Sequence, residues 1–241
     1  MRLLIVRHGD PDYIHDSLTE DGWKEAELLS ERLVNEKIDF FYISPLGRAK
    51  DTASFTLQKL GANYEIKEWL QEFTPRIKRP DRKLLRSRAW DWVPSDWVCH
   101  PEFLDLNHWY ENPVYQEAHV KENYDFVCKE FDALLAEHGY IRNGYMYHTE
   151  KGNHETLCFV CHFGLEGVLL SHLMNISPVP LWHGMVAQPS SVTEIYTEER
   201  RKGEVYFRIS EFGSTEHLYV HDRKPSFAAR YAECFEDQEA H

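Results

Sequence analysis

The N-terminal third of the chain alternates short apolar runs with longer amphipathic patterns, and this alternation constrains the fold more than any other feature. The apolar runs are typical of buried strands and cover residues 2–7, 38–44 and 64–70. The patterns between them predict helices over residues 17–36 and 46–60, the first with Thr19 as its N-cap. Strands separated by helices predict a parallel sheet that is covered by helices on both faces.

The second half of the chain continues with strand and helix patterns. They predict a helix over 119–140, a strand over 154–162, a helix over 164–175, a hairpin of strands 191–199 and 204–210, and a short helix over 224–238. We therefore expect an α/β fold, a three-layer α/β/α sandwich around a mostly parallel central sheet. The 241 residues suffice for one large core, and we expect a single domain over residues 1–241.

Charge and composition disfavour several classes of partner. The net charge of −13 argues against a nucleic acid or an anionic membrane surface as the main partner. No apolar run approaches the roughly 18 residues of a membrane span, and the run before Arg7 is too short for a signal peptide. The five cysteines, an odd number spread thinly, indicate free thiols in a reducing compartment. We expect a cytoplasmic protein.

One cysteine pattern matches the letters of a haem attachment site, Cys158-Phe159-Val160-Cys161-His162. It lies in a predicted strand, where residues three apart point to opposite faces. We therefore expect neither a haem group nor a redox pair there.

Charged side chains gather where the predicted strands end. Arg7 and His8 end the first strand, Arg48 lies in the first turn after the second, and His162 ends the fourth. Because ligands bind beyond the carboxyl ends of parallel strands, we expect these groups to converge there, together with two helix N-termini. Two arginines and two histidines suit a tetrahedral dianion such as phosphate. Gly9 is expected to let the backbone approach that ligand.

Three stretches resemble the histidine phosphatase superfamily, also called the phosphoglycerate mutase-like family: LIVRHG, SPLGRAKDTA and FVCHFG. LTEDGWKEAELLSERL and FGSTEHL agree with it, and the resemblance covers about residues 1–73 and 155–220. It implies that His8 attacks phosphorus and forms a phosphohistidine. Arg7, Arg48 and His162 would neutralise charge on the phosphoryl oxygens. Water then hydrolyses the phosphoenzyme, and neither a metal nor another cofactor is implied.

The resemblance also implies an acidic residue that protonates the leaving group, located after the third strand. The stretch WLQEF at 69–73 is similar to the family's L-x-E pattern, so Glu72 is assigned this role. Asp91, in the following segment, is the alternative. A general acid needs a raised pKa, so we expect Glu72 to be partly buried near the pocket.

Substrate binding is expected from Arg7, Arg48 and the backbone N–H of Phe163. The loop asparagine that the family uses to hold phosphate is missing from the short loop DPDYIHD, and Tyr13 or His15 is expected to take its place. These departures favour a phosphatase over a mutase, because a mutase must protect its phosphoenzyme from water.

Residues 74–118 are rich in proline and tryptophan and break the alternation of strands and helices. We interpret them as an insert that caps the active site. Between Arg76 and Arg88 this segment holds seven basic residues against a single acid, Asp81. The basic stretch 76–88 is either a solvated charged face or a wall that attracts an anionic substrate.

The favoured function is a metal-independent phosphoric monoester hydrolase with a small anionic metabolite as its substrate. Three alternatives stay open: a phosphoglycerate mutase-type phosphotransferase, a phosphate-binding or regulatory module without turnover, and a phosphatase that acts on protein phosphohistidine. The sequence leaves the oligomeric state unknown and is compatible with a homodimer.

Overall fold

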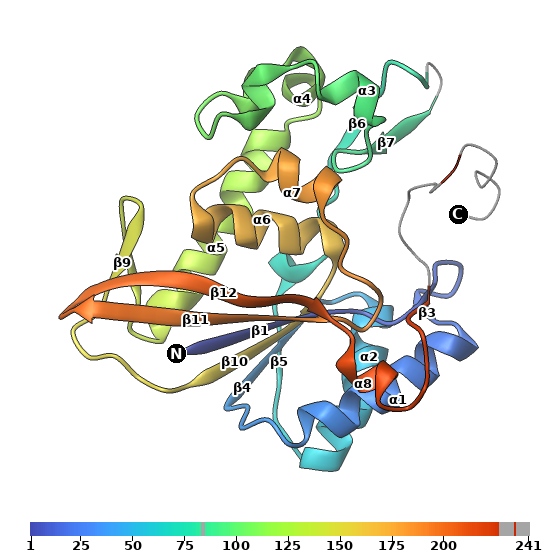
Figure 1. Ribbon diagram of the computed structural model, residues 1–241, viewed down its shortest axis with the longest axis vertical. Helices are drawn as coiled ribbons and strands as arrows, with labels where there is room; N and C mark the ends of the chain where they lie inside the picture. Colours follow the sequence, from blue (N-terminus) through green and yellow to red (C-terminus); the bar gives the residue numbers. More distant parts are fainter. Residues whose placement is uncertain (83–84, 227–233, 235–241) are drawn as a thin grey trace.

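A computed structural model describes residues 1–82, 85–226 and 234. An eight-stranded sheet in the order β5-β4-β10-β1-β11-β12-β9-β8 lies between layers of helices (Figure 1). Its strands are β1 (Arg2–Arg7), β4 (Phe40–Ile43), β5 (Glu65–Ile66), β8 (Ile141–Asn143), β9 (Met146–His148), β10 (Thr156–Cys161), β11 (Val192–Arg201) and β12 (Glu204–Ser214). The predicted α/β sandwich is confirmed.

The helices are α1 (Glu20–Leu33), α2 (Gly47–Leu60), α3 (Pro94–Trp97), α4 (Pro113–Glu117), α5 (Val120–Glu137), α6 (Phe163–Met174), α7 (Pro178–Gly184) and α8 (Glu216–Tyr219). Short 3-10 turns are η1 (Glu68–Leu70), η2 (Pro101–Leu104) and η3 (Trp109–Glu111). Two small ribbons pair β2 (Pro11–Asp12) with β3 (Ser17–Leu18), and β6 (Arg76–Lys78) with β7 (Arg86–Arg88).

The central sheet is mixed, with a parallel half and an antiparallel half. Strands β5, β4, β10 and β1 run parallel, as the alternation of strands and helices predicts. The predicted hairpin β11–β12 then joins β1 antiparallel, and β9 and β8 extend that half. A hairpin needs only a tight turn and no crossover helix, which is why this half departs from the mostly parallel sheet expected.

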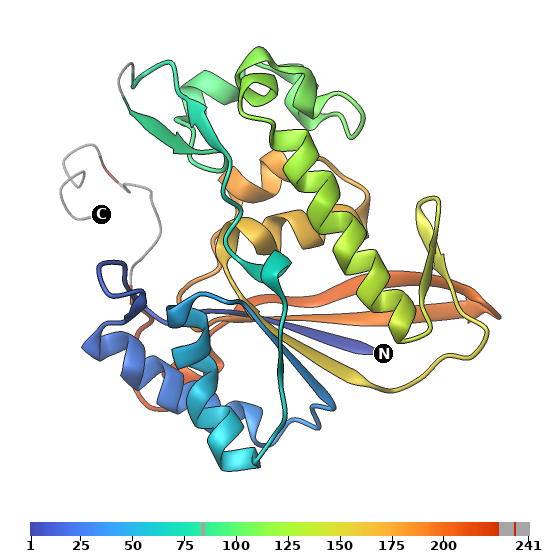
Figure 2. The same cartoon turned by 180° about the vertical axis from the view of Figure 1, so that it is seen from behind.

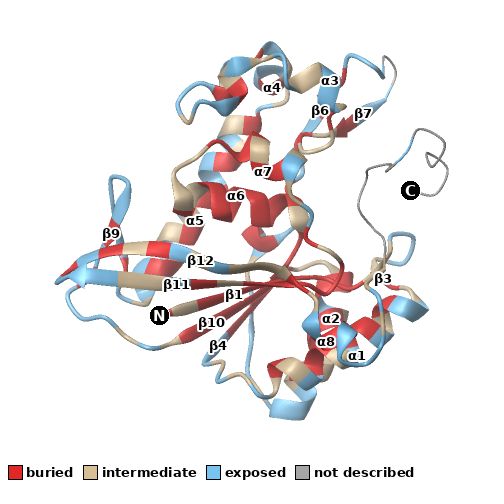
Figure 3. Ribbon diagram, in the orientation of Figure 1, coloured by how far each residue is buried: buried red, intermediate tan, exposed pale blue. Residues whose placement is uncertain are grey.

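Each face of the sheet packs against its own group of helices (Figure 3). Leu3 and Ile5 of β1 join a core with α5, α6 and α7, whereas Leu4 and Val6 face α1 and α2. This alternation along one strand follows from the pleat. Cys158 and Cys161 of β10 fall in opposite cores, as expected, so they cannot form a redox pair.

The helix predicted over 17–36 and the strand predicted over 64–70 are both shorter in the structure. Thr19 caps α1 as predicted, because its side chain accepts a hydrogen bond from the Gly22 N–H. The strand expected over 64–70 is only the two-residue β5, since the chain turns into η1 and buries Trp69 and Leu70. Most of the helix predicted over 224–238 lies outside the described residues.

Residues 74–118 form the ribbon β6–β7 and the short elements from α3 to α4, and they lie beyond α6 and α7 from the sheet (Figure 1). Seen from behind, α5 runs from this region down to the sheet (Figure 2). Trp92 and Trp109 are buried in the same core as Trp182 of α7, so these indoles serve packing. No helix in the described part of the chain is long and apolar enough to cross a membrane.

Candidate active site

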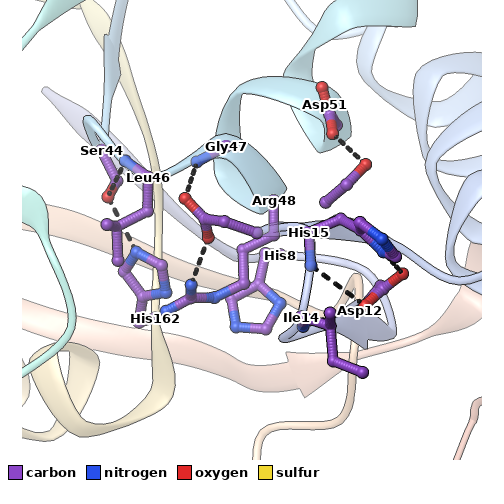
Figure 4. A network of polar contacts seen from close by, with 12 residues as sticks. His8, Asp12, Ile14, His15, Ser44, Leu46, Gly47, Arg48, Asp51 and His162 are labelled. Carbon is purple, nitrogen blue, oxygen red and sulfur yellow. Dashed lines mark hydrogen bonds and ion pairs between the residues drawn. The ribbon is translucent and has the colours of Figure 1, made fainter.

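His8 and His162 face each other because they follow adjacent parallel strands in register. Arg7, the last residue of β1, pairs with Cys161, the last residue of β10, and the His8 N–H donates to the Cys161 carbonyl at 3.1 Å. The two imidazole rings lie 5.0 Å apart between their centroids and are tilted by 57°. The carboxyl edge of the parallel half thus brings together the two histidines predicted from sequence (Figure 4).

The ring of His8 is held in one orientation and one tautomer. It is 2% exposed, and its Nδ1 lies 2.7 Å from the Gly9 carbonyl oxygen. A carbonyl only accepts, so Nδ1 carries the proton, and Nε2, which has no partner among the described residues, keeps its lone pair. Burial, followed by the charges of Arg7 and Arg48, lowers the pKa of His8 well below its ordinary value of 6.5. His8 is therefore a neutral ring with an available nucleophilic nitrogen.

Gly9 has a different role from the one expected. A Cβ there would lie 2.8 Å from the carbonyl oxygen of Gly22, so the missing side chain lets the strand end approach α1 rather than a ligand. The loop after His8 is thereby packed against the first helix.

Arg7 and Arg48 are both buried beside the histidines. The guanidinium of Arg7 donates to the Ala187 carbonyl, and its Cζ lies 5.9 Å from the centre of the Phe163 ring. Arg48 is 9% exposed, and its Nη1 donates to Oδ1 of Asp16 at 2.6 Å. Its charge also lowers the pKa of both His8 and His162.

Asp16 was not predicted from the sequence. Its Oδ2 accepts the Gly47 N–H at the first residue of α2, at 2.7 Å, while Oδ1 binds Arg48. One carboxylate therefore ties the loop to the N-terminus of α2 and orients Arg48. The signal in the sequence was only an acid in a loop, 32 residues away from its partner.

Tyr13 and His15, the two loop residues expected to help hold phosphate, differ from each other in what they contact. Tyr13 is 63% exposed, and the Arg48 Cζ lies 5.5 Å from its ring centre. His15 has a side chain 73% exposed, and its Nδ1 lies 2.6 Å from Oδ2 of Asp12. Tyr13 therefore borders the site, whereas the ring of His15 is held within its own loop.

Glu72 follows η1, and its side chain contacts the N-terminal turn of α6. Its Oε1 accepts the N–H groups of Phe73 at 2.7 Å and Leu165 at 3.2 Å, which leaves Oε2 to carry a proton. Burial raises the pKa of Glu72 above its ordinary value of 4.5, although both hydrogen bonding from Phe73 and the charges of Arg48 and Arg7 oppose that rise. A protonatable carboxyl thus lies close to both buried arginines.

Asp91, the alternative acid, is placed otherwise. Its Oδ1 forms an ion pair with Nη1 of Arg79 at 3.2 Å, and the same guanidinium binds Asp81. This contact ties the Asp91 carboxyl group to Arg79, whereas the Glu72 carboxyl group contacts the start of α6, next to His162. The geometry therefore favours Glu72 over Asp91.

Phe163 is the first residue of α6, so its backbone N–H has no acceptor within the helix and can bind an anion. The Phe163 ring meets Trp90 edge to face at 5.7 Å. Trp90 follows β7, so residues 74–118 reach the same place as Glu72 and the start of α6.

Three of the seven basic residues in the stretch 76–88 form ion pairs with acids. Lys78 and Arg86 pair with Glu117, and Arg79 is 7% exposed between its two aspartates. Arg88 is placed differently: Nη1 donates to the Thr74 carbonyl at 3.0 Å, and its charge acts on Glu72 and His162. Lys83 lies outside the described residues.

Comparison with known proteins agrees with this geometry. The family model of the histidine phosphatase superfamily (branch 1) matches residues 3–98. A protein of Hydrogenobacter thermophilus named "Putative phosphoserine phosphatase 2" is 24% identical over 214 residues, which cover 85% of this chain and 94% of the relative.

Two solved structures share the fold. A mutant phosphoserine phosphatase from Entamoeba histolytica, in complex with phosphoserine, has 16% identity and a TM-score of 0.59 over 90% of this chain and 98% of its own. A mycobacterial glucosyl-3-phosphoglycerate phosphatase has 18% identity and a TM-score of 0.58 over 88% and 98%. The matched family and the names of these relatives support a phosphatase.

Proposed function

The chain carries the histidine phosphatase superfamily signature over residues 3–98, as its motifs predicted, and from this premise we propose that it hydrolyses phosphate monoesters through a phosphohistidine on His8. One observation carries the proposal. Two neutral, buried imidazoles lie 5.0 Å apart at the ends of adjacent parallel strands, and one of them keeps its Nε2 lone pair free. A structural histidine pair would need neither the free nitrogen nor two buried arginines beside it.

The proposed reaction has two displacements. In the first, Nε2 of His8 attacks phosphorus while the bond from phosphorus to the ester oxygen breaks, and Glu72 gives its proton to the departing alkoxide. In the second, water attacks the phosphohistidine, the P–N bond breaks, and the Glu72 carboxylate takes up the proton from water. The enzyme returns to its starting state and releases inorganic phosphate.

Charge on the phosphoryl oxygens is met by groups that are already fixed before substrate arrives. Arg7 and Arg48 are held by the Ala187 carbonyl and by Asp16, and α6 offers the Phe163 N–H. Preorganised donors of this kind stabilise a transition state without reorganising during the reaction. These protein cations and the helix N-terminus are the groups assigned to charge stabilisation, so no step is assigned to a metal ion.

We propose that the substrate is a small metabolite with a second anionic group besides its phosphate. The charge of Arg88, in the stretch 76–88, acts on Glu72 and His162, and this supports a contact between Arg88 and the second anionic group. Phosphoserine, bound in one structural relative, carries a carboxylate of this kind. The packing of Trp90 on Phe163, the first residue of α6, supports a small substrate rather than a folded protein.

Hydrolysis of p-nitrophenyl phosphate by purified protein tests the proposed function, with a panel of phosphorylated metabolites to find the natural class. We expect His8→Ala to abolish turnover, whereas His148→Ala, a change on the remote strand β9, should leave it intact. Tight binding of inorganic phosphate without turnover would identify a binding module instead. Transfer of the phosphoryl group to a second metabolite rather than to water would identify a mutase.

A further inference from the structure

We propose that Ser44 is a positioning residue that fixes the tautomer of His162, so that this ring offers an N–H to phosphate while His8 offers a lone pair. The effect of this tautomer on catalysis rests on the proposed function, whereas the tautomer of His162 does not depend on it. Ser44 was not among the residues expected from the sequence to act in the site.

The fold brings Ser44 to His162 in the same way as it brings His162 to His8. Strand β4 lies parallel beside β10, and Ser44 follows the last residue of β4, with its N–H donating to the Val160 carbonyl at 3.0 Å. Three adjacent strands therefore end side by side in Ser44, His162 and His8. Ser44 and His162 are both 0% exposed, and the serine Oγ lies 2.8 Å from Nε2 of the ring (Figure 4).

The hydrogen bonds around Ser44 decide the direction of that contact. The Ser44 Oγ accepts a hydrogen bond from the Leu46 N–H at 3.3 Å. Within residues 1–82, 85–226 and 234, Nε2 of His162 is its one other partner, and therefore the one possible acceptor for the serine O–H. If Nε2 carried the proton, the serine O–H would be a buried donor with no acceptor, which is costly. When the serine O–H donates to Nε2, both the hydroxyl and Nε2 are satisfied, and Nδ1 is the one polar atom of the pair left without a partner among the described residues.

The proton of the neutral ring then belongs on Nδ1. This nitrogen is buried and has no hydrogen-bond partner in the described part of the chain. An N–H at Nδ1 can donate to a phosphoryl oxygen, whereas a lone pair at the same place would repel it. Burial, followed by the charges of His8, Arg48 and Arg7, lowers the pKa of His162 well below 6.5, so the ring is neutral and its tautomer decides what it offers.

His8 is arranged in the complementary way. Its Nδ1–H is taken by the Gly9 carbonyl, and Nε2 is left as the nucleophile. A main-chain acceptor on one ring and a side-chain donor on the other thus give two neighbouring histidines opposite roles.

The test is the tautomer of His162 in the unliganded protein, read from heteronuclear NMR of isotope-labelled histidine, with peaks assigned by comparison with His8→Ala and His162→Asn. We expect a protonated Nδ1 and an unprotonated Nε2 at His162. Ser44→Ala should move the proton to Nε2 at least in part. It should also weaken binding of inorganic phosphate by about 10- to 100-fold, the loss expected for one hydrogen bond to a charged group. Ser44→Thr, which keeps the hydroxyl, should restore both.

A wild-type His162 protonated at Nε2 would overturn the proposal, as would an unchanged tautomer and phosphate affinity in a folded Ser44→Ala protein. If Ser44→Ala does not fold, the wild-type spectrum alone decides. Neither readout needs turnover. A protein without phosphatase activity would refute the proposed function, but the tautomer of His162 could still be tested. An active enzyme whose His162 is protonated at Nε2 would refute the role of Ser44 and leave the proposed function intact.

Discussion

Replacing Gly164 by alanine should displace Glu72, the proposed general acid, without touching His8, the proposed nucleophile. Gly164 is the second residue of α6, and a Cβ there would lie 2.3 Å from Nε1 of Trp90 and 2.7 Å from Oε1 of Glu72. Ordinary contacts of a Cβ begin at 3.4 Å, so the two side chains must retreat by about 1 Å.

The expected effect is large on chemistry and small on stability. Crowding a packed site costs about 1–3 kcal/mol, and alanine returns up to about 1 kcal/mol of helix propensity. A misplacement of about 1 Å at a reacting group can slow a reaction about 100-fold. We therefore expect kcat for an alkyl phosphate to fall about 100-fold in Gly164→Ala, while the protein stays folded.

The assay compares two leaving groups. The p-nitrophenolate ion leaves with almost no help from an acid, so kcat for p-nitrophenyl phosphate should change only a few-fold, on the order of 3-fold. Gly184→Ala is the matched control, because a Cβ at Gly184 of α7 meets nothing within 4 Å. It should leave kcat for both substrates unchanged.

Two outcomes would refute the reasoning. An equal loss with both substrates would mean that the substitution distorts the phosphate pocket rather than the acid. No loss with the alkyl phosphate would mean either that Glu72 does not retreat or that it is not the acid. The thermal midpoint of each variant separates these results from simple unfolding.

Three further predictions follow from the charges in the structure. Because burial raises the pKa of Glu72, kcat for an alkyl phosphate should fall as pH rises through that pKa. Glu72→Gln should lower kcat about 100- to 10,000-fold and remove this fall from the pH profile. A pH profile unchanged in Glu72→Gln would reject Glu72 as the general acid. Burial raises the pKa of Glu166 from 4.5 to about 7, so the folded state holds a proton that the unfolded chain releases, and stability should fall by up to about 3 kcal/mol as pH rises between those values. Urea titrations should show that Glu166→Gln, which keeps an acceptor for the Thr193 hydroxyl, removes this contribution to the pH dependence of stability. A pH dependence identical to that of the wild type would contradict it. Arg88→Gln should raise KM for phosphoserine about 10-fold and flatten its salt dependence, whereas Arg86→Gln, at a residue paired with Glu117, should not; equal effects would count against a role for Arg88.

The sequence predicted the parts of the fold that repeat a local pattern. Strand β1 and helices α1 and α2 follow from apolar spacing and the cap at Thr19, and the ends of β1 and β10 follow from where those runs stop at Arg7 and Cys161. These ends predicted that His8 and His162 converge at one edge of the sheet, and the structure adds that β1 and β10 are neighbours paired in register.

Contacts that depend on long-range placement could not be predicted in this way. Asp16 is one acid among several in its loop, and only the folded chain shows that it holds Arg48 and the start of α2. The basic stretch 76–88 has an excess of charge in the sequence, but Arg79 and Lys78 pair with Asp91 and Glu117, which lie outside the stretch. Arg88 is distinguished by its position at the end of β7. Ser44 could have been predicted as a residue of the site, because it directly follows an apolar run, as Arg7 and His162 do.

Trapping the covalent intermediate tests the central claim most directly. The enzyme is mixed with labelled substrate, quenched within one turnover, and digested for peptide mapping by mass spectrometry. We predict a phosphoryl group on His8 that is labile in acid and stable in alkali, that decays at least as fast as kcat, and that is absent from His8→Ala. Turnover without any phosphoenzyme, or a label on another residue, would contradict the account.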